Sequence, residues 1–361
     1  MFSIFKNFKK TRSFGVDIGT KTIKAVEISY KNGQAFLENY GEVNLDFACK
    51  ESFRYFDKNT LNPNVDNISL AIRELIFETK TKNKEVSFSL PDFSSFFSIF
   101  EMPPMSKKEI DGAIGFEARK YIPLPLAEVV LDWQSMENAI SEKNVNKVLV
   151  MAVPKVIIEH YKEISKKAGL VLLSLEPEAM SLKRSVVRKD KSETICIAEI
   201  GFQSTNVSIV EKGFMKISFS FDVSGKDLTN AISDSLALDM EVAEASKIKY
   251  GLLENEEFLL YPILEPVLFS ISSKIREVIK DFEKKEGTLV EKVVFLGGTT
   301  RMPGIMDYFN KSLVREGVAT FEIINGKPFD NIVCPEGLEK QMDNLNANYA
   351  IALGQALSKF E

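Results

Sequence analysis

One alternation of apolar and polar positions occurs twice along the chain. The first copy, VDIGTKTIKAVEI, spans residues 16–28, and the second, AEIGFQSTNVSIV, spans residues 198–210. In each copy an apolar run reaches an acidic residue, an isoleucine and a glycine, and a polar tip leads directly into a second run. Alternation with period two is typical of half-buried strands, so each copy predicts a β-hairpin. Two such hairpins, each at the start of one half of the chain, indicate a duplicated domain with a cleft between the halves.

The tips of the two predicted hairpins have the chemistry of a phosphate site. A glycine lets backbone N–H groups approach an anion without a Cβ in the way, while hydroxyl and lysine side chains add donors. An acid at the strand end can hold hydrated Mg²⁺. A strand followed by glycine is usually only a turn, but the repetition favours a site that grips a polyphosphate from both sides. The candidate phosphate residues are Gly19, Thr20, Lys21, Thr22, Gly201, Gln203, Ser204 and Thr205, and the candidate metal ligands are Asp17 and Glu199.

Periodic positions also predict the elements around the hairpins. The second hairpin leads into a strand with Met215, Ile217, Phe219, Phe221 and Val223 on one face. Ser106 and Glu109 have the spacing of a capping box, and a helical apolar face follows. Residues 94–168 therefore read as strand, helix, strand, strand and helix. The face of the first helix comprises Ile110, Ala113, Ile114, Ala118 and Tyr121, and that of the last comprises Ile157, Tyr161, Ile164 and Ala168.

A third element completes the candidate site. The stretch EKVVFLGGTTRMPGIMDYFNKSL predicts a buried strand over 293–296, then Gly297 and Gly298, then a helix capped by Thr299 or Thr300 with Pro303 in its first turn. A double glycine leaves room for a base or ribose against the backbone, although it is equally typical of a plain strand–loop–helix connection. The small residues of NANYAIALGQALSK predict a closely packed closing helix, expected to return to the first half.

Composition narrows the class of protein. The 361 residues are 45% hydrophobic and 27% charged, with a net charge of −5, which is typical of a globular protein and argues against a nucleic-acid-binding molecule. His160 is the single histidine, and Cys49, Cys196 and Cys334 are far apart. These residues disfavour a Ser-His-Asp or Cys-His nucleophile, a zinc site and a disulfide framework. The basic start, residues 1–12, reads as a frayed leader or as a weak contact with an anionic membrane surface.

Taken together, these stretches resemble the actin-like ATPase superfamily, which includes actin, sugar kinases, heat-shock chaperones, MreB, FtsA and PilM. In that comparison DIGTKT is similar to the first phosphate loop, EIGFQST to the second, FLGGTTRMPG to the adenosine motif and ANYAIALGQAL to the second connecting helix. EVAEASKIKYG is similar to the helix over the base and ribose. The resemblance implies an α/β, actin-like (ribonuclease H-like) fold that binds ATP and Mg²⁺. It adds Glu244, Lys247, Gly297, Gly298, Thr299 and Met302 as nucleotide-binding residues.

Within the superfamily the chain is most similar to the PilM family of type IV pilus assembly proteins, mainly through FSLPDFSSFFSIFEMPPMSKKEIDGAIGFEARKYIPLPLAEVVLDWQSM. This likeness implies a basic leader at 1–12, a first actin-like domain at 13–93 and 169–190, and an α+β insert at 94–168. A second domain follows at 191–345 and a closing helix at 346–361. The charged stretch at 188–193 marks the boundary between the halves.

The resemblance also implies a function and a place in the cell. We expect an ATP-binding cytoplasmic adaptor that docks the tail of a PilN-like inner-membrane protein on the insert, through phenylalanine and methionine side chains. Pilus motor ATPases and self-association are further expected partners. Glu199 replaces the usual Asp of the superfamily, and no water-positioning residue is evident, so hydrolysis is expected to be slow at most. An FtsA-like or filament-forming protein and a small-molecule kinase remain the alternatives. The insert side chains are Phe93, Phe96, Phe97, Phe100, Met102 and Met105.

Overall fold

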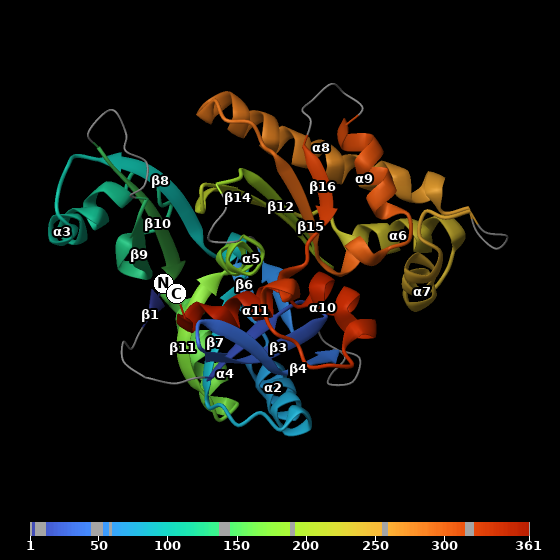
Figure 1. Cartoon of the computed structure of the whole chain (residues 1–361), viewed down its shortest axis with the longest axis horizontal. Coiled ribbons are helices and arrows are strands. Elements are labelled where there is room, and N and C mark those ends of the chain that lie inside the picture. The colour runs from blue at the N-terminus through green and yellow to red at the C-terminus, as the bar shows by residue number, and fades with distance from the viewer. Residues whose placement is uncertain are drawn as a thin grey trace. The chain divides into compact units, whose positions relative to one another are not determined.

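The computed structural model describes residues 2–3, 12–44, 53–57, 60–136, 145–187, 192–254, 259–314 and 321–360. The chain forms two compact units (Figure 1). Unit 1 comprises Met1–Ser181 and Gln355–Glu361, and unit 2 comprises Leu182–Gly354. Most of the basic leader, Cys49 and part of the charged stretch at 188–193 lie outside the described residues.

Unit 1 is built on a six-stranded sheet in the order β1-β11-β7-β2-β3-β4. Strands β2, β7 and β11 are parallel, while β3, β4 and β1 pair antiparallel with their neighbours. The strands are β1 (Phe2–Ser3), β2 (Arg12–Ile18), β3 (Thr22–Lys31), β4 (Gln34–Asn44), β7 (Glu85–Leu90) and β11 (Val171–Pro177). The helices are α2 (Val65–Thr79), α4 (Lys155–Lys167) and the start of α5 (Glu178–Val186), whose residues from Leu182 on belong to unit 2. Strands β5 (Arg54–Asp57) and β6 (Thr60–Pro63) form a separate hairpin.

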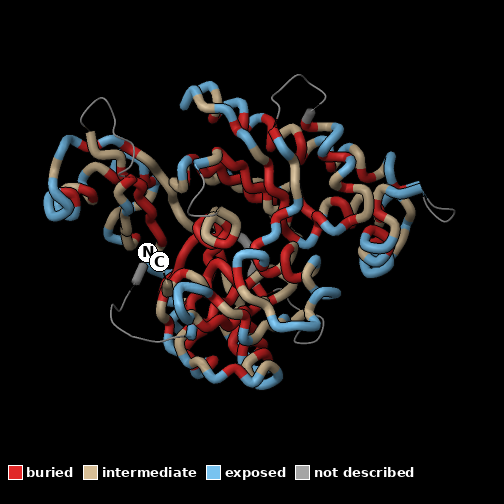
Figure 2. Tube along the Cα trace, in the orientation of Figure 1, coloured by how far each residue is buried: buried red, intermediate tan, exposed pale blue. Residues whose placement is uncertain are grey.

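One face of this sheet is covered by α2 and α4, which bury the main apolar core of unit 1 (Figure 2). The predicted stripe of α4 lies in this core, with Ile157, Tyr161, Ile164 and Ala168 all buried. The last helix of the 94–168 stretch is therefore part of the main core of unit 1 and not of the insert core. The C-terminal segment of the chain joins the same unit, because Lys359 Nζ lies 3.1 Å from Glu85 and the Phe360 ring stacks on Tyr30.

The insert has its own small sheet and core. Strands β8 (Phe96–Met102), β10 (Asn146–Pro154) and β9 (Val129–Ser135) pair antiparallel in that order, and α3 (Lys107–Ala118) packs on them. The capping box is present, since the Ser106 N–H donates to Glu109 Oε2 at 2.6 Å. Ile110, Ile114 and Ala118 are buried as predicted, but Tyr121 is half exposed and stacks on Phe100 at 4.9 Å.

Unit 2 has a five-stranded sheet in the order β14-β13-β12-β15-β16. The elements are β12 (Ile195–Ile200), β13 (Thr205–Glu211), β14 (Phe214–Phe221), α6 (Gly225–Leu236), α7 (Met240–Tyr250), α8 (Tyr261–Glu286), β15 (Lys292–Leu296), α9 (Ile305–Val314), β16 (Glu322–Asn325), α10 (Met342–Asn348) and the first part of α11 (Ala350–Leu357). From Gln355 on, the residues of α11 belong to unit 1. Its core joins β12, β13 and β15 to α6, α8 and α9. Phe219 departs from the expected buried face of β14, because its side chain is 43% exposed.

The two sheets repeat one topology. In unit 1 the strands run β11-β7-β2-β3-β4, and in unit 2 they run β16-β15-β12-β13-β14, with the same parallel and antiparallel pairs. In both units the predicted hairpin is the central antiparallel pair, so the fold is duplicated. One predicted element begins later than expected: the helix after the double glycine starts at Ile305, because a 3₁₀ turn occupies Gly298–Arg301 and turns the chain first.

No helix among the described residues combines the length and the apolar character that a membrane crossing requires.

Candidate functional site

The first hairpin closes on its glycine. The Gly19 N–H donates to the Thr22 carbonyl at 2.9 Å, which ties the two ends of the tip together. A Cβ at position 19 would lie 2.7 Å from that carbonyl oxygen, so the turn accepts only glycine without a backbone shift. Thr20 and Lys21 occupy the tip between these residues, and both are partly exposed.

Asp17 lies where β2 meets its parallel neighbour. Its side chain is buried, and Oδ1 accepts a hydrogen bond from Ser89 Oγ at 2.7 Å. Ser89 is on β7 and is in register with Glu176 on β11, whose side chain is only 2% exposed. The ends of three parallel strands therefore bring together two carboxylates, separated by two strand spacings of about 5 Å each. The sequence pattern did not identify Ser89 or Glu176, and their only signal is the position of each near the end of an apolar run.

The second hairpin repeats the first. The Gly201 N–H donates to the Ser204 carbonyl at 3.0 Å, as the Gly19 N–H donates to the carbonyl of the third residue after it in the first hairpin. Glu199 takes the place of Asp17, and its Oε2 accepts from the buried Asn206 amide at 3.3 Å. The Thr205 hydroxyl is buried and donates to the Val223 carbonyl at 2.6 Å. Gln203 and Ser204 remain partly exposed at the tip.

The double glycine lies against the second hairpin. Gly297 has φ +94, and a Cβ there would lie 2.8 Å from Glu199 Oε1 and 2.3 Å from the Ile200 carbonyl oxygen. A Cβ on Gly298 would lie 2.8 Å from Asn348 Oδ1. Thr299 Oγ1 donates to the Gly201 carbonyl at 3.2 Å. Four predicted residues of unit 2, Glu199, Gly201, Gly297 and Thr299, therefore form one cluster.

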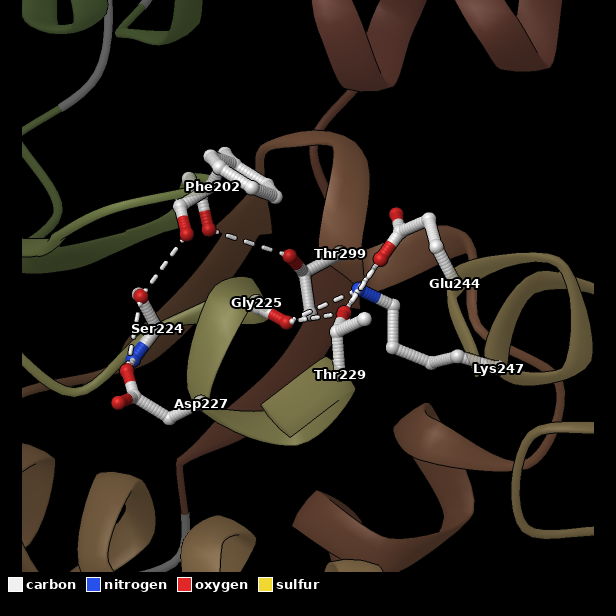
Figure 3. A network of polar contacts seen from close by, with 9 residues as sticks. Phe202, Ser224, Gly225, Asp227, Thr229, Glu244, Lys247 and Thr299 are labelled. Atoms are coloured by element: carbon white, nitrogen blue, oxygen red, sulfur yellow. Dashed lines mark hydrogen bonds and ion pairs between the residues drawn. The ribbon is translucent and has the colours of Figure 1, made fainter. Parts of the chain in front are cut away.

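A buried lysine extends this cluster through α6 and α7 (Figure 3). Lys247 Nζ donates to the Gly225 carbonyl at 2.9 Å and to Thr229 Oγ1 at 2.8 Å, and it pairs with Glu244 Oε2 at 2.7 Å. The Gly225 N–H in turn donates to the Gly201 carbonyl at 3.0 Å. Three acceptors compensate for burying the ammonium group. The Glu244–Lys247 pair thus joins α7 to the hairpin tip, and Thr229 and Gly225 are network members that the sequence analysis missed.

The other predicted residues have different surroundings. Met302 is 4% exposed and lies in the apolar core of unit 2. Burial raises the pKa of the Cys196 thiol to about 12, so the thiolate that acts as a nucleophile is disfavoured at neutral pH. Within the described ranges, no group of three or more His, Cys, Asp or Glu side chains could hold a metal ion by itself. One or two carboxylates are nonetheless sufficient for Mg²⁺ that also binds water and phosphate.

Comparison with known proteins supports the fold that these sheets indicate. The PilM-PilN type IV pilus biogenesis complex has a TM-score of 0.81 and 23% identity, covering 97% of this chain and 98% of that chain. MreB5 of Spiroplasma citri bound to ADP has a TM-score of 0.52 and 12% identity, covering 97% and 96% of the two chains. These likenesses confirm the predicted α/β, actin-like fold.

Two sequence comparisons agree with this fold. The cell division protein FtsA of Enterococcus faecalis (strain ATCC 700802 / V583) is 24% identical over 335 residues, which cover 81% of this chain and 74% of FtsA. The family model described as type IV pilus assembly protein PilM matches residues 15–360. The predicted family is therefore confirmed: the chain belongs to the type IV pilus assembly protein PilM family.

Proposed function

We propose that this member of the PilM family is an ATP-binding adaptor, which docks the tail of a PilN-like inner-membrane protein. The observation on which the nucleotide part rests is the repeated hairpin. In each unit a glycine N–H closes the tip, and a carboxylate lies two residues before that glycine. A solved actin-like structure similar in fold, MreB5, is bound to ADP, and the same ligand class suits the present loops.

The proposed roles follow from the chemistry of each group. Backbone N–H groups and the Thr20, Lys21 and Ser204 side chains would hold phosphate oxygens. Asp17 and Glu199 would hold Mg²⁺, which neutralises the phosphate charge and favours carboxylate and water ligands. Gly298 would leave room for the base. Lys247 would support the second hairpin indirectly, because its ammonium donates to the Gly225 carbonyl and the Gly225 N–H donates to the Gly201 carbonyl.

A pair of glycine variants tests nucleotide binding. Gly201→Val introduces a side chain whose Cβ would lie 3.0 Å from the Ser204 carbonyl, inside the tip. We expect a 10- to 100-fold loss of ATP affinity in equilibrium dialysis, from an overpacking cost of about 1–3 kcal/mol. The matched control is Gly112→Ala in α3, where an added Cβ meets nothing within 4 Å. Equal affinity of both variants and wild type would remove the second hairpin from the site.

Hydrolysis, if it occurs, is proposed to be slow, well below the typical enzyme median of about 10 s⁻¹. The Glu199 carboxylate is one methylene longer than aspartate and would hold a metal ion at a different position. Glu176 adds a buried carboxylate at the same ends of the parallel strands as Asp17, and it is a candidate for ordering a water there. ATP would then act chiefly as a structural ligand that stabilises the folded state. Phosphate release at ordinary enzyme rates that is abolished in Asp17→Ala would contradict this part of the proposal.

The partner site is proposed on the insert. Strand β8 is an edge strand of the insert sheet, and an extended tail can add main-chain hydrogen bonds along such an edge. Phe100 and Met102 are buried in the insert core, and Phe96 and Met105 pack against it. Phe97 and Ile99 are on the opposite face of β8 and are partly exposed, so they are the apolar side chains offered to a tail. Support also comes from the fold likeness to the PilM-PilN complex.

Point variants test this docking better than deletion of residues 94–168, which would remove α4 from the core of unit 1. Phe97→Ser should weaken binding of a synthetic PilN-like tail by about tenfold. The matched control is Phe116→Ser in α3, because that ring is 69% exposed and lies outside β8. If Phe116→Ser lowers the affinity and Phe97→Ser does not, the tail binds elsewhere on the insert.

Self-association and binding to pilus motor ATPases stay predictions, and the filament-forming and kinase alternatives are separable from the adaptor. Sedimentation of the full chain with and without ATP tests filaments. Phosphate transfer to a panel of small molecules tests a kinase.

A further inference from the structure

Gln355 is a fully buried amide on α11 among apolar neighbours. Ala352, Leu353 and Ala356 on the same helix are also fully buried. A buried amide destabilises the folded state unless its polar atoms are bonded. Gln355 Nε2 donates to Ser181 Oγ at 2.7 Å and, over a longer 3.4 Å, to the Glu176 carbonyl. Because a leucine would fill this space without that cost, the two bonds of the amide require an explanation.

The two acceptors are on either side of one connection. Strand β11 ends at Pro177 and α5 begins at Glu178, so Glu176 and Ser181 bracket the strand-to-helix joint. Asp92 holds the same joint from another part of unit 1, because its Oδ1 accepts from the Ala179 N–H at 3.0 Å. Side chains from two distant segments therefore fix the backbone at this position.

The joint carries the Glu176 carboxylate. The direction of a side chain at a strand end follows from the local backbone, so the position of the joint sets the position of the carboxylate. Glu176 is in register with Ser89, which donates to Asp17, the proposed magnesium ligand. A shift of about 1 Å in a group at a reacting centre can change a rate by about 100-fold.

We propose that Gln355 is a positioning residue: its amide holds the β11–α5 joint. The Glu176 carboxylate then stays at the end of β11, next to Ser89 on β7 and two strands from Asp17 on β2. The proposal rests on the nucleotide function proposed above. It links the C-terminal segment of the chain to the Glu176 and Asp17 carboxylates, and all three residues belong to unit 1.

A double-mutant cycle between Gln355→Leu and Glu176→Gln tests the link. The two quantities measured are the Mg²⁺-dependent affinity for ATP and the single-turnover rate of phosphate release. In the wild-type background, loss of the amide bonds should change at least one of them by about fivefold. In the Glu176→Gln background the same substitution should have less than about a twofold effect, since groups that act through each other are not additive.

The matched control is Ser358→Ala. It removes another fully buried hydrogen bond of the same segment, from Ser358 Oγ to the Gln355 carbonyl at 2.7 Å, and leaves the amide in place. We expect it to lower the melting temperature without changing either readout. Additive effects of Gln355→Leu and Glu176→Gln on both readouts would overturn the positioning role while the wild type still binds ATP. A folded wild type that binds no ATP would instead refute the proposed function itself.

Discussion

At the scale of single residues, glycine and carboxylate positions define the candidate site. Asp17, Gly19, Glu199 and Gly201 follow from a local sequence pattern, because the bond that closes each tip spans only three residues. Ser89 does not follow from any local pattern, since it is 72 residues from the aspartate to which it donates. Its contact depends on strand order and register, which tertiary packing decides.

Removing the charge of Asp17 tests its proposed role. Asp17→Asn keeps an oxygen that can accept from Ser89 Oγ but removes the negative charge. We expect Mg²⁺ to strengthen ATP binding by about tenfold or more in wild type and not in the variant. The matched control is Asp66→Asn, whose parent side chain is 82% exposed and pairs with Lys167. Affinities measured by dialysis in Mg²⁺ and in EDTA give the comparison, and a retained magnesium effect in Asp17→Asn would exclude Asp17 as a ligand.

We expect a buried carboxyl group in unit 1, Glu27, to make the stability of the fold depend on pH. Burial raises the pKa of Glu27, and this effect outweighs the opposing charge of Arg12, 3.8 Å away. Because the folded state binds this proton more tightly than the unfolded state, the contribution is fully present below the unfolded pKa and is lost as pH rises through the folded pKa. Glu27→Gln should therefore melt at a higher temperature than wild type at pH 8, with the difference shrinking toward pH 4. A difference that grows on acidification would contradict this assignment.

At the scale of elements, helix caps and strands were predicted more accurately from the sequence than the connections between elements. The capping box of α3 is encoded within four residues, so the sequence predicted it correctly. The start of α9 was wrong by a few residues, because nothing local distinguishes a first helical turn from the 3₁₀ turn at Gly298–Arg301. The core against which α4 packs could not be predicted from the apolar face of the helix, because such a face does not specify which sheet it contacts.

The α3 cap has a measurable energy. Ser106→Ala removes the side-chain half of the capping box and should lower the free energy of unfolding by about 1 kcal/mol. Urea unfolding followed by circular dichroism measures the change. The matched control is Lys108→Ala, an exposed position in the same first turn, for which we expect no more than about 0.5 kcal/mol. Equal losses in the two variants would mean that the box contributes nothing to stability.

At the scale of the whole molecule, duplication is the organising feature. Both units place a glycine-tipped hairpin beside parallel strands, and the repeated sequence template predicted this. The return of residues 355–360 to unit 1 was expected from the small residues of this segment. The Gln355, Lys359 and Phe360 contacts that make it are tertiary and have no local sequence signal. The finer division into domains at 13–93, 94–168 and 191–345 remains a prediction.

The central claim is that the full chain binds MgATP, and calorimetric titration of the wild-type protein tests it most directly. We predict a saturable heat with ATP and Mg²⁺ at submillimolar to millimolar ligand, a weaker one in EDTA, and none for Gly201→Val under the same conditions. The same titration with a folded, monodisperse protein that gives no ATP heat at millimolar ligand would contradict the claim.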